Sequence, residues 1–281
     1  MWAEEILSCQ RPDGLWGDWF HTLAVPRAGK MITTEQALRR LWALGFTAQD
    51  ASIARALDTL RASLRGERTI PDRREVTHDW DLFTRMMLAA WLRLFLSEDP
   101  DACAVADEWA GVLAGAFEGG EYDRAAYARA YTDAFGKPPR GVRFEDFCQF
   151  YVVVLACGRL APDVEARVFA HILRHPEGIY YVYHKPLAAL PETFASREAS
   201  RYLGAMELLA RYRRPACRER LAFVADWLCQ NRGPDGWDMG ASARDGVYFP
   251  LSDSWRTRQS RVADCTARVE QLLLALQGEG T

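Results

Sequence analysis

Apolar residues recur along most of this chain with the spacing of an α-helix, and two kinds of segment alternate. In residues 50–65 they form a single stripe, at Ile53, Leu57, Leu60 and Leu64. Residues 79–96, in contrast, are apolar around most of the helical circumference. A helix with one stripe packs on one side only, whereas a helix that is apolar all round is buried. The sequence therefore predicts outer and inner helices in alternation.

The same pattern covers the whole chain and predicts an all-α fold. The outer helices are expected at 2–9, 50–65, 100–117, 162–174 and 217–230. The inner helices are expected at 34–45, 79–96, 144–158, 197–212 and 264–276. An extra helix is expected at 121–135, before the break at Gly136-Lys137-Pro138-Pro139. Repeated helical hairpins of this kind form closed or solenoidal arrays. No linker is visible, so we expect one domain over residues 1–281.

Composition excludes several classes of protein. Of the 281 residues, 49% are hydrophobic, which is typical of a globular chain. The net charge of −3 and the pI near 6.0 do not indicate the basic surface that nucleic-acid-binding proteins carry. No apolar run is long enough to span a membrane, and no signal peptide is visible. The seven cysteines form no C-x-x-C pair, which favours reduced thiols and a cytoplasmic location.

Two similar motifs stand near the two ends of the chain. The first reads Q-x-x-D-G-x-W, with Gln10, Asp13, Gly14 and Trp16. The second has Gln230, Asp235, Gly236 and Trp237, without a residue between its glycine and tryptophan. Both follow predicted outer helices. Unsatisfied backbone groups at a helix end need partners, which a glutamine amide can supply.

These motifs resemble the QW repeats of the terpenoid cyclase and protein prenyltransferase superfamily, which includes the squalene-hopene cyclases. The resemblance implies an α/α toroid of about five to six helical hairpins, as in a single-toroid bacterial member. It implies that glutamine and tryptophan clasp the turn after an outer helix and have no part in catalysis. It also implies an apolar, isoprenoid substrate in a central cavity.

The inner helices of such an array run parallel, so their acidic first turns would gather at one mouth. Asp79 and Asp81 match the first part of the D-x-D-D acid motif of class II terpene cyclases, with Leu82 in the fourth position. The resemblance implies that Asp81, assisted by Asp79, is the general acid. Such an acid must stay protonated through burial or a neighbouring carboxylate. The alternative is that Asp79 caps the helix and Asp81 is a first-turn acid.

Further residues are candidates for substrate binding. Aromatic faces stabilise cations, and arginine suits a diphosphate or a carboxylate. The candidates on inner helices are Trp42, Trp80, Phe83, Arg85, Tyr151, Arg197, Glu198 and Arg201. Those near the last inner helix are Asp253, Trp255 and Asp264. The alternatives are plain core packing for the aromatic residues and an internal ion pair for Arg197 and Glu198.

The sequence contains part of a zinc-binding pattern. Protein prenyltransferases bind zinc through D-x-C at the start of an inner helix and a distant histidine, but here Asp264 and Cys265 are adjacent. His78 and Cys148 are donors at the same predicted end of the array, and zinc accepts Asp, Cys and His. Because the spacing of Asp264 and Cys265 fails, we expect no metal and no other cofactor.

Three functions remain open. The first is a terpenoid cyclase-like enzyme that protonates an apolar isoprenoid substrate. The second is a glycan-active hydrolase or lyase on a similar helical barrel, for which paired carboxylates and exposed tryptophans are suited. The third is a non-catalytic toroid that binds a small molecule or a protein. The sequence does not predict an oligomeric state.

Overall fold

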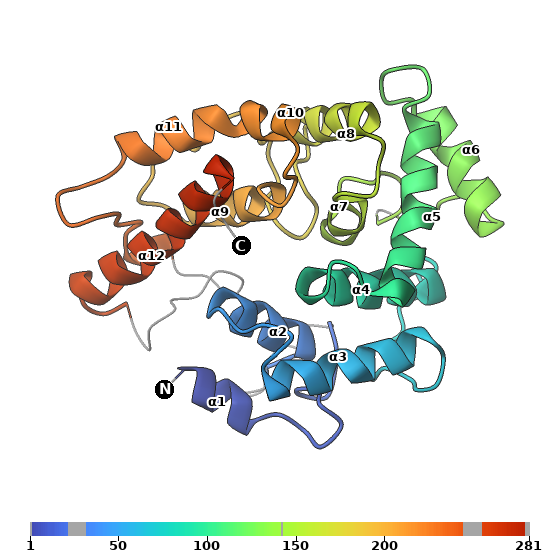
Figure 1. Cartoon of the computed structure of the whole chain (residues 1–281), viewed down its shortest axis with the longest axis horizontal. Coiled ribbons are helices and arrows are strands. Elements are labelled where there is room, and N and C mark those ends of the chain that lie inside the picture. The colour runs from blue at the N-terminus through green and yellow to red at the C-terminus, as the bar shows by residue number, and fades with distance from the viewer. Residues whose placement is uncertain (1, 22–31, 142, 244–254, 279–281) are drawn as a thin grey trace. The chain divides into compact units, whose positions relative to one another are not determined.

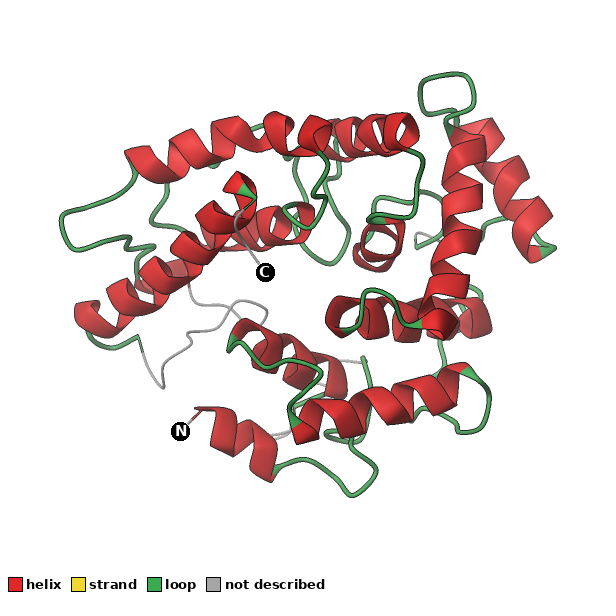
Figure 2. Ribbon diagram, in the orientation of Figure 1, coloured by secondary structure: helices red, strands yellow, loops and turns green. Residues whose placement is uncertain are grey.

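The computed structural model describes residues 2–21, 32–141, 143–243 and 255–278, and these residues are largely helical (Figures 1 and 2). Within them, extended pairing is limited to isolated bridges such as Ile179 with Tyr183. The prediction of an all-α fold is confirmed. The chain divides into two compact units, residues 1–107 and 108–281. The toroid and the single domain stay predictions.

The first unit holds the N-terminal helices. They are α1 (Trp2–Ser8), α2 (Thr34–Ala43), α3 (Ala51–Leu64), α4 (Trp80–Phe95) and the first half of α5 (Pro100–Ala116). Helix α3 presents its apolar stripe to α4, and most of α4 is buried from Met86 to Leu94. This burial is what the apolar circumference of residues 79–96 predicted.

The second unit holds the remaining helices. They are the rest of α5, α6 (Arg124–Phe135), α7 (Phe150–Ala156), α8 (Pro162–Arg174), α9 (Arg197–Leu209), α10 (Pro215–Arg218), α11 (Ala222–Gln230) and α12 (Arg258–Gln277), with 3₁₀ turns η1 (Glu219–Leu221) and η2 (Ala241–Ala243). All of α7 is buried, and α8 buries one face that includes Val168 and Ile172. Helices α9 and α11 both pack against α12.

Two predicted inner helices begin elsewhere. Helix α7 begins at Phe150 and not at 144, because Cys148 and Phe150 pair with Tyr180 in a parallel bridge region: Tyr180 N donates to Cys148 O and Phe150 N to Tyr180 O. Helix α12 begins at Arg258 and not at 264, because Thr257 caps it. Asp264 therefore lies inside a helix, and the prediction that it opens one is wrong.

The tryptophans of the two sequence motifs make matching contacts. Nε1 of Trp16 donates to Ile6 O in α1 at 2.8 Å, and Nε1 of Trp237 donates to Leu228 O in α11 at 2.7 Å. Each indole thus satisfies a carbonyl near the end of the preceding helix. Both tryptophans are buried.

The glutamines of the motifs differ. Nε2 of Gln10 donates to Gly14 O and to Ser52 O in α3, each at 2.8 Å, so it joins the turn to the next outer helix. Gln230 is exposed. The glycine of the first turn is required, because Gly14 has φ 84° and a Cβ there would lie 2.6 Å from Arg55 O.

Among the described residues, no helix is both long and apolar enough to cross a membrane. The segment DGVYFPL (residues 245–251) lies outside the described residues.

Candidate metal centre

The segment just before α7 presents an aspartate and a cysteine on one side of a tight turn. Oδ1 of Asp146 accepts from the backbone N–H of Cys148 at 2.7 Å, which orders the two side chains relative to each other. Tyr180 N donates to Cys148 O at 2.9 Å, so the segment is also bound to the loop after α8. Cys148 is buried, and Asp146 is 31% exposed at its side chain. The carboxylate therefore lies at the edge of the group that water can reach.

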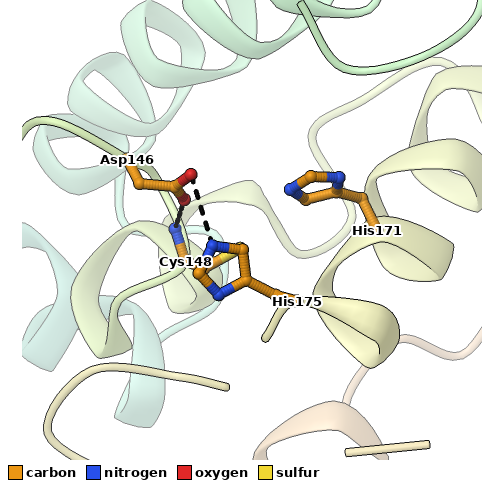
Figure 3. Close-up of side chains that lie close together, drawn as sticks. All are labelled: Asp146, Cys148, His171 and His175. Carbon is orange, nitrogen blue, oxygen red and sulfur yellow. Dashed lines mark hydrogen bonds and ion pairs between the residues drawn. The ribbon is translucent and has the colours of Figure 1, made fainter. Parts of the chain in front are cut away.

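The C-terminal end of α8 supplies two histidines to the same place. His171 lies in the last turn of α8 and His175 is its C-cap residue, four positions further on, so both project from the same side of the helix end. Their ring centroids are 5.6 Å apart. Nε2 of His175 lies 3.4 Å from Oδ2 of Asp146. Figure 3 shows both rings turned toward Asp146 and Cys148.

Together these residues form a group of four potential metal ligands. One donor atom from each of Asp146, Cys148, His171 and His175 lies within 4.8 Å of the others. In a tetrahedral zinc site with bonds near 2.1 Å, oxygen and nitrogen ligands are about 3.4 Å apart. The separation of Asp146 and His175 already has this value. The group needs only small side-chain movements to surround one ion.

Aromatic rings close one side of the group. The ring of His171 lies 4.5 Å from Tyr122, 5.4 Å from Phe147 and 5.8 Å from Phe117, measured between centroids. These rings limit the access of water to the histidine and restrict its rotation. A ligand restrained in this way loses less conformational entropy when it binds an ion.

Polar atoms at the group lack partners. His171 Nε2, His175 Nδ1 and the hydroxyl of Tyr122 are buried and make no hydrogen bond with any described residue. A buried polar atom without a partner costs about 1–3 kcal/mol, so native proteins rarely leave one. Three such atoms around one carboxylate and one thiol indicate a group that binds something further.

The protonation of the side chains follows from their surroundings. Burial lowers the pKa of His171, so its ring is neutral and offers a lone pair. The hydrogen bond to Asp146 raises the pKa of His175. Burial acts to raise the pKa of Asp146, but the donors His175 and Cys148 lower it overall. Burial, and then the charge of Asp146, raise the pKa of the Cys148 thiol well above its usual value. A divalent cation would reverse this last effect, because it binds the thiolate.

The residues predicted for acid catalysis lie in the first unit. Asp79 caps α4, with Oδ1 accepting from Leu82 N at 3.1 Å, and Asp81 is exposed in the first turn. This is the helix-capping alternative considered for them, and their catalytic role stays a prediction.

Two aromatic candidates for substrate binding lie close together in the same unit. Trp80 and Phe83 lie 5.7 Å apart, measured between ring centroids, and both contact the rings of the buried residues His21 and His78. Trp42 and Arg85 are half-buried.

The residues predicted for substrate binding in the second unit form no single group. Tyr151 is buried, with its ring 5.2 Å from Phe150, and Arg197 is exposed. Arg201 is half-buried on the same helix as Glu198. Oε1 of Glu198 accepts from Lys185 Nζ at 2.8 Å and from Tyr183 at 3.0 Å. 

The structure does bring two of these predicted residues together. Nε1 of the buried Trp255 donates to Oδ2 of Asp264 at 2.7 Å. This hydrogen bond accounts for the positions of both side chains. Asp253 lies outside the described residues.

Sequence reasoning missed the group of four. It tested D-x-C at Asp264 and Cys265, where the spacer is absent, and overlooked Asp146-Phe147-Cys148, where it is present. It considered Cys148 only as a zinc donor together with His78, Asp264 and Cys265. The signal that was available is D-x-C before a buried helix, followed by histidines four apart on an amphipathic helix.

Comparison with known proteins found no match for this chain. No protein-family model, no curated protein and no solved structure matches the chain. The function must therefore be argued from the group itself.

Proposed function

We propose that this protein binds zinc through Asp146, Cys148, His171 and His175. The observation that carries the proposal is the convergence of four donor atoms within 4.8 Å, with the buried Nε2 of His171 lacking a hydrogen-bond partner among the described residues. Thiolate, imidazole and carboxylate together are ligands that zinc accepts. Magnesium and calcium prefer oxygen ligands and several of them, which this group does not supply.

The mixture of donors favours a reactive zinc over a purely structural one. Structural zinc sites are most often built from four ligands rich in cysteine, whereas catalytic sites use three ligands of mixed type and leave one position open. Here there is one cysteine, and the carboxylate of Asp146 is partly exposed to solvent. Asp146 and Cys148 also have the D-x-C spacing of the zinc ligands in protein prenyltransferases. We therefore propose that the partly exposed Asp146 is the ligand that an incoming molecule can displace.

Metal binding is tested directly on the full chain. Purified protein, freed of metal by a chelator, is titrated with Zn²⁺ in competition with a chromogenic chelator, and Co²⁺ is used for its visible spectrum. We expect one ion per chain and a sulfur-to-cobalt charge-transfer band from Cys148. The variants Cys148→Ser and Asp146→Asn should lose most of the affinity, because each removes an anionic ligand.

A matched cysteine provides the control. Cys217 is also buried in the second unit but lies outside the group, so Cys217→Ser should keep both the affinity and the charge-transfer band. Zinc affinity in Cys148→Ser equal to that of the unmodified protein would refute the site. An exogenous thiol or imidazole that leaves the cobalt spectrum unchanged would refute the displacement of Asp146 and favour a closed, structural ion.

The terpenoid cyclase-like activity is a separate proposal that rests on the sequence motif of Asp79 and Asp81. Its test is turnover of polyenes and isoprenoid diphosphates by Asp81→Asn compared with the unmodified protein. Full activity in the variant would end the acid role of Asp81. The zinc proposal does not depend on this result.

A further inference from the structure

The loop between α5 and α6 places a tyrosine against the metal ligands. Tyr122 precedes Asp123, whose side chain caps α6 by accepting from Ala126 N at 2.8 Å and whose backbone N–H donates to Ala116 O at 3.0 Å. These bonds fix the loop to both helices. The ring of Tyr122 lies 4.5 Å from His171 and 5.5 Å from Phe147. The tyrosine therefore has a defined position beside the group.

The hydroxyl of Tyr122 is a donor without an acceptor. It is buried and makes no hydrogen bond of good geometry with the part of the chain that the structure describes. Burial, and then the nearby negative charges of Asp146 and Cys148, raise the pKa of the Tyr122 hydroxyl, and a weaker hydrogen-bonding interaction with Asp146 adds to this rise. The hydroxyl consequently keeps its proton and lies near the carboxylate. The hydroxyls of three buried tyrosines in the same unit are paired, namely those of Tyr127, Tyr202 and Tyr212, the last donating to Val153 O at 2.7 Å.

Zinc binding would change the hydrogen-bond partners of Asp146. Without the ion, Oδ2 of Asp146 faces Nε2 of His175 at 3.4 Å, and a proton on that nitrogen can be shared with the carboxylate. An imidazole nitrogen that binds zinc carries no proton, so Asp146 loses this partner when Nε2 becomes a ligand. Carboxylates that bind metal generally accept a hydrogen bond from an outer group as well.

We infer that Tyr122 is a positioning residue for the metal centre, whose hydroxyl donates to Asp146 when zinc is bound. The inference rests on the proposed zinc site. The juxtaposition of a buried hydroxyl that has no well-formed hydrogen bond with a carboxylate that loses one of its two donors on metal binding supports it. The bond holds Asp146 in one orientation and so fixes which oxygen coordinates the ion.

The test compares Tyr122→Phe with Tyr212→Phe. Removing an outer-sphere partner typically weakens metal affinity by about 10–100-fold, and we expect this loss of zinc affinity in Tyr122→Phe. The cobalt spectrum should shift, because the carboxylate changes its orientation. The metal-free variant should be at least as stable to urea as the unmodified protein, since an unpaired hydroxyl has been removed. Tyr212→Phe should show the reverse, with lower metal-free stability and unchanged zinc affinity.

Three results would overturn the inference. Zinc affinity and a cobalt spectrum unchanged in Tyr122→Phe would show that the hydroxyl has no part in positioning Asp146. A clear loss of metal-free stability would show that the hydroxyl already has a partner without zinc. Failure of the unmodified protein to bind Zn²⁺ or Co²⁺ would overturn the zinc proposal together with this one, whereas the first two results leave the zinc site intact.

Discussion

At the scale of single residues, one threonine links the first tryptophan turn to the inner helix that follows. Oγ1 of Thr34 donates to Trp16 O and accepts from Trp16 N, each at 2.9 Å, and Thr34 is buried. Thr34→Val keeps the shape and leaves both backbone groups of Trp16 unpaired. We expect a loss of about 2–6 kcal/mol in the free energy of unfolding, at about 1–3 kcal/mol for each group. Urea unfolding followed by tryptophan fluorescence measures it.

The second turn supplies the matched comparison. Oγ1 of Thr266 accepts from Trp237 N at 3.0 Å, and Thr266 is only half-buried. Thr266→Val should therefore cost less than Thr34→Val. Equal costs for the two variants would contradict the view that satisfied backbone groups, and not the threonine methyl groups, determine the contribution.

An ion pair near the second turn predicts how stability depends on pH. Asp238 binds Arg261 through both oxygens, at 2.6 and 3.0 Å, and this hydrogen bonding holds the pKa of Asp238 below its ordinary value of 3.8. A carboxylate with a lowered folded-state pKa stabilises the fold above its unfolded-state pKa, and this contribution is lost as pH falls through the folded-state value. Asp238→Asn should cost about 1 kcal/mol at pH 7, a modest figure because the pair is partly exposed.

The same variant should differ little from the unmodified protein at pH values below the lowered pKa of Asp238, where both carry a neutral side chain. Urea unfolding at neutral and strongly acidic pH checks both statements. An equal deficit at the two pH values would mean that the charge of Asp238 does not contribute.

At the scale of helices, apolar periodicity and capping residues predicted which helices exist and which of their faces are buried better than they predicted where each helix begins and ends. The ranges 50–65 and 162–174 correspond closely to α3 and α8, because each has one clean apolar stripe, and Pro162 marks the first turn of α8. The start of α7 could not be predicted, because it depends on Tyr180, a residue far along the chain that pairs with the backbone at Cys148. Local sequence carries no signal for such a bond.

The cap of α4 gives a prediction at this scale. Asp79 accepts from Leu82 N, whereas Asp81 is exposed and makes no capping bond. Asp79→Ala should cost about 1 kcal/mol in unfolding free energy, and Asp79→Asn much less, because asparagine caps nearly as well. Asp81→Ala should have a smaller effect. Thermal unfolding followed by circular dichroism compares the three. An Asp79→Asn variant as unstable as Asp79→Ala would show that the charge of Asp79, and not its cap, is what α4 requires.

At the scale of the whole molecule, the metal group shows what a sequence can and cannot provide. Asp146-Phe147-Cys148 and the histidines of α8 are both visible as local patterns. Tyr122 is not, because only the fold brings the loop after α5 against α8. The types of donor residue can therefore be predicted from the sequence. That they come together, and that unpaired polar atoms lie around them, can be seen only in the structure.

The two compact units predict where zinc will act on the whole chain. All four donors, together with Tyr122, belong to residues 108–281. A ligand that binds only the folded state stabilises it by mass action, and the effect on local opening is largest where the ligand holds segments together. Hydrogen exchange with and without Zn²⁺ should therefore show slower exchange in the α5–α6 loop, the segment before α7, and α8. The amides of α1 to α4 should be unchanged. Slower exchange confined to the first unit would place the ion elsewhere and refute the site.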